Sequence, residues 1–200
     1  MNLPNKITMS RIFLTILIII LMLFPFESAG LELPKLFINE TLVVDTKYFL
    51  VGVLFIIASI TDFFDGKLAR KRNLVTDFGK MIDAIADKVL VNTVWIILAS
   101  TGFISAIIPV IIIFRDTIVD SIKMVAGSKG NVVAASKTGK FKTAFMMMGI
   151  TLTLFYNLPF ELINIRVSDV LLIIACILSI VSAFEYYNSN KKYIFDGKDY

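Results

Sequence analysis

The sequence predicts an all-α integral membrane protein with six transmembrane helices, on three observations. Hydrophobic residues make up 57% of the 200 positions and the mean hydropathy is +0.82, whereas a soluble domain is about half apolar. The apolar residues fall into six runs, several of them near the roughly 20 residues that a helix needs to cross a bilayer. The basic residues collect in alternate connections between the runs. We therefore expect one membrane-embedded domain over residues 1–200.

Each run has a feature that supports its assignment. The first is longer than the apolar part of an ordinary secretory signal, so we keep it as a helix. The second and third carry aspartates at helical spacing, and the fourth carries two basic residues eight apart, which is close to two helical turns. The fifth opens with lysines, and the sixth holds the single cysteine, which we interpret as a packing residue. The expected helices cover about residues 7–26, 48–66, 81–100, 103–125, 141–160 and 170–187.

The distribution of basic residues predicts the topology. With a cytoplasmic N-terminus, every one of the 20 Lys and Arg residues except Lys35, Lys47 and Arg166 falls on the cytoplasmic side. Such an excess of positive charge marks cytoplasmic loops. We therefore expect both termini inside the cell, in a multi-pass protein of the cytoplasmic membrane.

The composition also limits the chemistry. The chain has no histidine and one cysteine, which excludes a histidine base, a thiolate-rich metal site and an internal disulfide. Acid-base steps must therefore use carboxylates, lysine, tyrosine or water. We expect no nucleic-acid partner.

Four aspartates form the strongest candidate site. Asp62 and Asp65 are three apart and Asp83 and Asp87 are four apart, so each pair shares one face of its helix. A carboxylate near hydrocarbon costs roughly 2.5 to 3.5 kcal/mol, and clustered carboxylates also repel one another. Carboxylate oxygens suit Mg2+ or Mn2+. The four aspartates therefore predict a site for two divalent metal ions at the cytoplasmic end.

The residues after the first aspartate pair suit a phosphate group. Gly66 allows close approach of the backbone, Ala69 is small, and the Arg70 guanidinium can contact a phosphate through two hydrogen bonds. Together with metals, they indicate a pyrophosphate-handling site. The ordinary alternative is that the aspartates are hydrated helix-end charges paired with nearby basic residues.

The spacing D-x-x-D-G-x-x-A-R, eight residues, then G-x-x-x-D-x-x-x-D over residues 62–87 resembles the signature of the CDP-alcohol phosphotransferase family. The resemblance implies that family's membrane fold. It implies that the four aspartates hold two metals, that Asp87 also acts as the base on the acceptor hydroxyl, and that Gly66, Ala69, Arg70 and Gly79 surround the CDP group.

Two further stretches are similar to one branch of that family, which transfers the phosphatidyl group of CDP-diacylglycerol to glycerol 3-phosphate and releases CMP. They are the opening residues 2–11, for which the resemblance implies that Asn5 and Thr8 lie near CDP, and the G-K-x-K-T pattern at 139–143. The chain differs from this branch at Ala84, where proline is common, and at Asp116, where glutamate is common. The resemblance also implies a homodimer, and it does not extend to the last helix.

We expect four basic residues to bind the phosphate of the acceptor: Arg115, Lys123, Lys140 and Lys142. The ordinary alternative for the lysines is contact with lipid headgroups. Another acceptor, such as inositol phosphate, serine or phosphatidylglycerol, would use the same chemistry. A cation transporter, with the aspartates as its translocation site, and a non-catalytic scaffold are the remaining alternatives.

Overall fold

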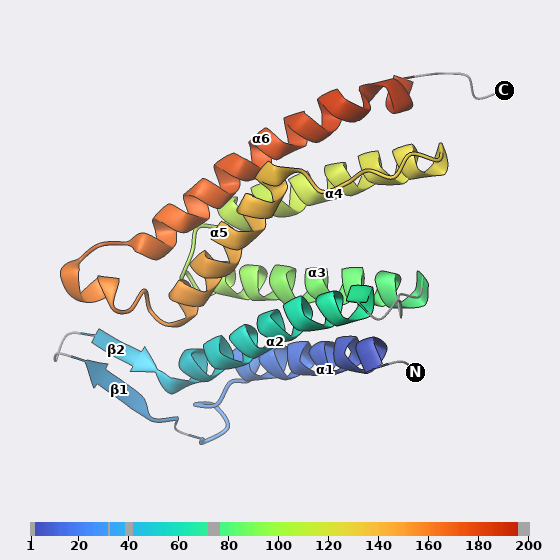
Figure 1. Cartoon of the computed structure of the whole chain (residues 1–200). Coiled ribbons are helices and arrows are strands. Elements are labelled where there is room, and N and C mark those ends of the chain that lie inside the picture. The colour runs from blue at the N-terminus through green and yellow to red at the C-terminus, as the bar shows by residue number, and fades with distance from the viewer. Residues whose placement is uncertain (1–2, 32, 39–41, 72–76, 196–200) are drawn as a thin grey trace. The chain divides into compact units, whose positions relative to one another are not determined.

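The computed structural model describes the backbone of residues 3–31, 33–38, 42–71 and 77–195; within them, the side chains of 3–6, 42, 62–71, 77, 78, 80 and 195 are not described. Most of this part of the chain is helical (Figure 1). The α-helices are α1 (Leu3–Leu23), α2 (Thr46–Lys71), α3 (Asp77–Ser100), α4 (Ile107–Ser128), α5 (Lys137–Leu154) and α6 (Val167–Phe195). They form two compact units, one of residues 1–101 with 154–158 and one of the remaining residues.

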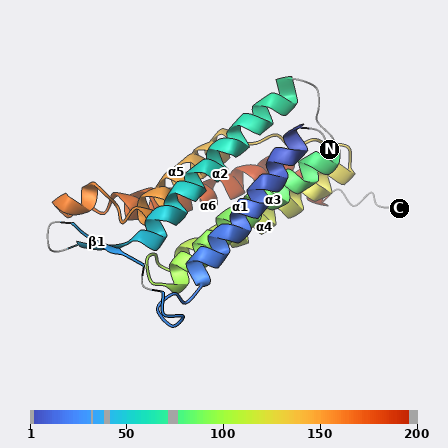
Figure 2. The ribbon, with the colours of Figure 1, turned by 90° about the horizontal axis from the view of Figure 1, so that it is seen from below.

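In the first unit, α1 packs against both α2 and α3, and Figure 2 shows the three helices from below. The buried face of α1 follows a spacing of three and four residues. It contains polar residues as well as apolar ones, and Thr15 donates a hydrogen bond to the carbonyl of Arg11 at 2.8 Å. The buried residues of α1 are Thr8, Arg11, Thr15, Ile18 and Met22.

The first unit also contains a β-hairpin, which the all-α prediction missed. Strands β1 (Lys35–Ile38) and β2 (Leu42–Asp45) pair antiparallel, with Lys35 opposite Asp45. Val44 is buried, and the backbone N–H of Asp45 donates to the Tyr156 hydroxyl at 3.1 Å. The prediction was wrong here because the short pair is stabilised by contacts with residues distant in sequence, and β propensity depends on such contacts.

In the second unit, α4 packs against α6, and α5 approaches α6 closely. A Cβ atom at Gly149 would lie 2.2 Å from Cδ2 of Leu172, so only glycine fits there without a shift. The fifth helix ends at Leu154, earlier than predicted, because Tyr156 and Asn157 adopt left-handed backbone conformations with φ of 55° and 56°. A short 3-10 turn, η1 (Phe160–Ile163), leads to α6.

Helix α6 exposes several large apolar side chains and buries several polar ones. Ile173, Ile177 and Phe184 are exposed, whereas Ser182 and Asn190 are buried. Exposed apolar and buried polar side chains suit a helix in lipid. Among the described residues, one helix segment, Val167–Ile194, is long and apolar enough to cross a membrane.

Candidate functional site

Two of the predicted metal ligands lie one turn apart on α3. Asp83 and Asp87 are both half-buried, and Gly79 lies one turn before Asp83 on the same helix. The side chain of Asp83 is 44% exposed, so its carboxylate is open to a ligand. Two accessible carboxylates on one helical face are a suitable part of a site for a hard divalent cation.

Arg11 of α1 makes an ion pair with one of these aspartates. Its Nη1 donates to Oδ1 of Asp83 at 3.0 Å, and the arginine side chain is 0% exposed. Thr8 precedes Arg11 by three residues on the same buried face. The contact holds the Asp83 carboxylate in place and partly balances its charge.

The other half of the predicted site lies outside the described side chains. The last turns of α2 carry Asp62, Asp65, Gly66, Ala69 and Arg70, and the first turn of α1 carries Asn5. Among the side chains that the structure does describe, no group of three or more acidic or cysteine residues is placed to hold a metal. The meeting of all four aspartates therefore stays a prediction.

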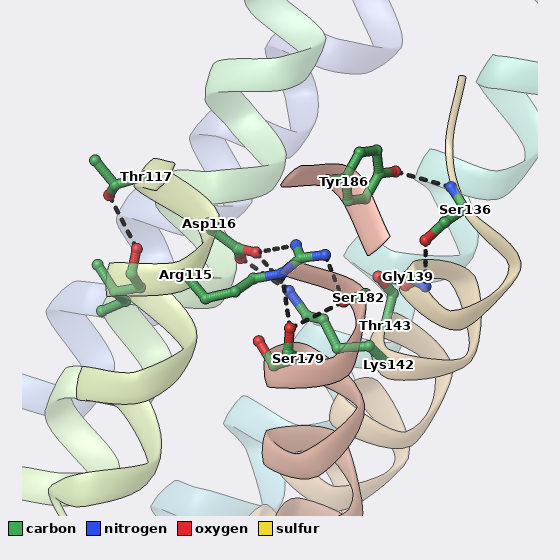
Figure 3. A network of polar contacts seen from close by, with 11 residues as sticks. Arg115, Asp116, Thr117, Ser136, Gly139, Lys142, Thr143, Ser179, Ser182 and Tyr186 are labelled. Carbon is green, nitrogen blue, oxygen red and sulfur yellow. Dashed lines mark hydrogen bonds and ion pairs between the residues drawn. The ribbon is translucent and has the colours of Figure 1, made fainter. Parts of the chain in front are cut away.

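A second charged cluster lies in the second unit, where α4, α5 and α6 each contribute residues (Figure 3). Asp116 accepts a hydrogen bond from Nη1 of Arg115 at 2.7 Å. Its two oxygens also accept from Nζ of Lys142 at 2.8 and 2.9 Å. These are the lengths of charge-assisted hydrogen bonds. Two buried cations thus share one carboxylate.

Helix α6 fixes the orientation of the arginine. Nε of Arg115 donates to the carbonyl of Ser179 at 3.1 Å, and Nη2 donates to Oγ of Ser182 at 2.6 Å. The hydroxyl of Ser182 in turn donates to the Ser179 carbonyl at 3.0 Å. Since three donor atoms of the guanidinium have partners in different directions, the head group has little freedom to rotate.

Tyr186, one turn further along α6, brings a third cation to the cluster. The guanidinium carbon of Arg115 lies 5.6 Å from the centre of the tyrosine ring, and Nζ of Lys123 lies 5.0 Å from it. Both distances are within the range of cation–π contacts. The structure therefore brings Arg115, Lys123 and Lys142 together, whereas Lys140 is exposed.

The beginning of α5 is fitted closely against this cluster. Ser136 caps the helix by accepting a hydrogen bond from the backbone N–H of Gly139 at 3.0 Å. The backbone N–H of Ser136 donates to the Tyr186 hydroxyl at 2.8 Å. A Cβ at Gly139 would lie 3.1 Å from Oγ of Ser136 and 3.8 Å from Nη2 of Arg115. Glycine at position 139 therefore lets the start of α5 lie close to Arg115.

Two recesses border the cluster. A polar recess of about 460 Å3 is lined by Ser136, Glu185, Tyr186 and Asn190, among others. An apolar groove of about 540 Å3 has Arg115 in its wall, beside Phe114 and Phe184. The polar recess meets the cluster at Tyr186 and the apolar groove meets it at Arg115, so the second unit offers space for a polar molecule and for an apolar chain.

Five residues of these clusters were not predicted from the sequence. Arg11 follows Thr8 by three residues in the opening motif, a spacing that predicts a shared helix face. Asp116 was noted only as a departure from the family. The last helix was thought uninformative, yet its polar residues occur at intervals of three and four in an apolar run, which indicates one polar face. These α6 residues are Ser179, Ser182 and Tyr186.

Acidic and basic clusters at apolar helices are the parts expected of a membrane enzyme that handles phosphate esters. The chain belongs to the CDP-alcohol phosphatidyltransferase family, whose profile matches residues 1–181. It is thus a transferase of a membrane-associated family.

Individual relatives agree with this assignment. A CDP-diacylglycerol–glycerol-3-phosphate 3-phosphatidyltransferase of Bacillus subtilis is 41% identical over 94% of this chain and 95% of its own length. The enzyme of that name from Rickettsia typhi is 34% identical over 96% of this chain and 98% of its own length. That from Mycoplasma pneumoniae is 35% identical over 77% of this chain and 68% of its own length.

Proposed function

We propose that this protein transfers the phosphatidyl group from CDP-diacylglycerol to sn-glycerol 3-phosphate, giving phosphatidylglycerophosphate and CMP. The observation that carries the choice of acceptor is the convergence of Arg115 and Lys142, both buried, with Lys123 at Tyr186. Cations gathered in one cluster suit an acceptor that itself bears a phosphate. The similarity to the three relatives above, over most of the chain, supports the same reaction.

In this proposal, Asp62, Asp65, Asp83 and Asp87 hold two divalent metal ions, Mg2+ or Mn2+. The two described members fit such ions, because both are half-buried carboxylates on one helical face. When bound, the ions neutralise the pyrophosphate and stabilise the departing CMP. Arg11 orients Asp83 through the 3.0 Å ion pair.

The residues of the chain then have separate tasks. CDP lies against a group of positions on α1, α2 and α3, and the acceptor phosphate lies against the cations of the second unit. Asp87 accepts the proton of the primary hydroxyl of glycerol 3-phosphate as its oxygen attacks the phosphorus that bears the lipid. A new oxygen–phosphorus bond forms, and the anhydride bond to CMP breaks. The CDP-binding residues are Asn5, Thr8, Gly66, Ala69, Arg70 and Gly79; the acceptor-binding residues are Arg115, Lys123, Lys140 and Lys142.

In this proposal, the reaction takes place at the cytoplasmic face of the cell membrane. Six transmembrane helices place both termini and the site on the cytoplasmic side of the cell membrane, and the protein works as a homodimer. The basic residues that support this topology lie mainly in the alternate connections. Since Cys176 is the single cysteine, a Cys176→Ala background allows one cysteine at a time to be introduced. An impermeant maleimide should label a cysteine at Lys35 and one at Lys137 from opposite sides of the membrane.

The decisive experiment measures CMP release from CDP-diacylglycerol by the purified protein, with and without EDTA. We expect release that depends on Mg2+ or Mn2+ and on glycerol 3-phosphate. Inositol phosphate, serine and phosphatidylglycerol are tested separately as acceptors. Release with inositol phosphate and none with glycerol 3-phosphate would change the acceptor but keep the chemistry. Absence of release with every acceptor would refute the proposal.

A further inference from the structure

Asp116 is more accessible than the two cations that it contacts. Its side chain is 28% exposed, whereas those of Arg115 and Lys142 are 10% and 5% exposed. The carboxylate can therefore leave its position toward the solvent-accessible side while the two cations stay enclosed. Its place could then be taken by another anion.

Arg115 is anchored independently of the carboxylate. Two of the donor atoms of Arg115 are held by the Ser179 carbonyl and the Ser182 hydroxyl, and these bonds do not depend on Asp116. The third donor, Nη1, and Nζ of Lys142 both point at the carboxylate. An anion with several oxygens on one centre can accept from both donors without moving them.

The cluster also has an unused hydrogen-bonding group. Ser179 is 0% exposed, and among the described residues its hydroxyl has no hydrogen-bond partner. Buried hydroxyls nearly always have one. Its carbonyl already accepts a hydrogen bond from Arg115. The Ser179 hydroxyl is therefore a group beside the cations that can still form a hydrogen bond.

Two other described acidic residues lie on the helices of this cluster. Glu185 on α6 is exposed and accepts a hydrogen bond from Thr138 at 2.6 Å. Asp120 lies one turn after Asp116 on α4 and is half-buried. Arg115 and Lys142 both contact the Asp116 carboxylate, and a dianionic phosphate in its place would carry one more negative charge toward these two cations.

We infer that Asp116 is a displaceable counter-ion. It holds Arg115 Nη1 and Lys142 in the free protein, and the phosphate group of the acceptor takes its place when the acceptor binds. This inference rests on the proposed function, which assigns the cluster to the acceptor. It makes acceptor binding an exchange of anions, so the site selects phosphate monoesters over neutral alcohols.

The test compares Asp116→Asn with the unchanged protein in neutral detergent, with inorganic phosphate, glycerol 3-phosphate and glycerol as probes. Binding is measured by the rise of the unfolding temperature with probe concentration. We expect Asp116→Asn to bind both phosphate probes about tenfold more tightly, because a competing charge-assisted interaction is gone. Glycerol should not stabilise either protein. Equal or weaker phosphate binding would overturn the inference.

Two control variants are used: one keeps a carboxylate at position 116, and the other makes the same carboxylate-to-amide change at a distant surface position. Asp116→Glu retains the carboxylate and should bind phosphate within about threefold of the unchanged protein. Asp169→Asn is the matched carboxylate-to-amide change, since Asp169 pairs with Arg166 at 3.6 Å on the surface. It should leave phosphate binding unchanged. A tenfold gain in either control would also overturn the inference.

Loss of the counter-ion can also destabilise the free protein. Asp116→Asn and Asp116→Ser are therefore purified in phosphate, which is then removed by dialysis. Unfolding on removal supports the inference, because phosphate has then assumed the role of the carboxylate. Unfolding of both variants even in phosphate contradicts it. Stabilisation by phosphatidylglycerol vesicles but not by soluble phosphate would also contradict it, because the displacing anion would then be a lipid headgroup.

The test of the anion exchange and the test of the proposed function can fail independently. CMP release by the unchanged protein tests the reaction, and phosphate binding by the variants tests the exchange. Release without any gain in phosphate affinity would refute the exchange alone. A gain in affinity without release would refute the reaction alone.

Discussion

The two units of the chain contain charged clusters of opposite character. In the first unit, Asp83 and Asp87 lie on one face of α3, and Asp83 receives one buried arginine, Arg11. In the second unit, Arg115 and Lys142 share one carboxylate, Asp116. The first cluster suits a cation and the second suits an anion, although each contains a resident group of the other sign.

The resident group of opposite sign is buried in the first cluster and more accessible in the second. Arg11 is fully buried and its aspartate is the exposed member, whereas Asp116 is the exposed member and its cations are buried. In both clusters the carboxylate is the group that a ligand can reach. The carboxylates would coordinate metal ions in the first unit and give way to an anion in the second.

Asp87→Asn should give the largest effect. The change removes a predicted metal ligand and the proposed base, and loss of a general base costs about 100-fold to 10000-fold in rate. We expect CMP release to fall by at least about 100-fold, with the helical content unchanged in circular dichroism. Asp169→Asn, at a surface ion pair, is the control and should keep normal activity. An Asp87→Asn protein with near-normal turnover would remove Asp87 from the mechanism.

Lys142→Gln should affect the acceptor more than the donor. A charge-assisted hydrogen bond contributes about 1.5 to 3 kcal/mol, so the KM for glycerol 3-phosphate should rise by about 10-fold to 100-fold. The KM for CDP-diacylglycerol should change little. Lys191→Gln removes an exposed lysine on α6 and serves as the control. An increase in the KM for the lipid alone would assign Lys142 to the donor and contradict the comparison.

Most of the fold was predictable because apolar runs of helical length are visible without knowledge of tertiary contacts. The hairpin was not, since Asp45 at its end donates to the Tyr156 hydroxyl, 111 positions away in the sequence. The end of α5 was also missed. Tyr156 and Asn157 carry the left-handed turn, and the apolar run continues past them.

The candidate site was predictable where its residues follow a pattern along one helix. Arg115 and Lys123 were expected to share a face because they are eight apart, and both lie over Tyr186. The ion pair between Arg11 and Asp83 joins different helices, so no spacing within one helix predicts it. A sequence gives the faces of helices but not the partners that those faces meet.

Arg11→Gln should make the first unit more dependent on divalent cations. The change removes the cation that contacts Asp83 and leaves repulsion between carboxylates unbalanced. In EDTA we expect a loss of about 1.5 kcal/mol in the free energy of unfolding. Most of this loss should be recovered in Mg2+, so the difference in unfolding temperature between Mg2+ and EDTA widens. Arg11→Lys keeps the charge and should behave more like the unchanged protein. An unaltered difference in Arg11→Gln would mean that Arg11 does not balance the acidic cluster.

Gly139→Ala should have the smallest effect, and it tests how closely the second cluster is fitted. The new Cβ would lie 3.1 Å from Oγ of Ser136, so the cap must shift by a few tenths of an ångström. Alanine favours the helix by about 1 kcal/mol over glycine, and a disturbed cap costs about 1 kcal/mol, so stability should barely change. The shift carries the start of α5 and therefore Lys142, so the KM for glycerol 3-phosphate should rise about threefold. The matched change is Gly127→Ala on α4, where a Cβ meets no atom within 4 Å; it should leave KM unchanged. If both substitutions leave KM unchanged, close packing at Gly139 is not needed to hold the cations, and the hydrogen bonds from α6 alone keep the anion site in shape.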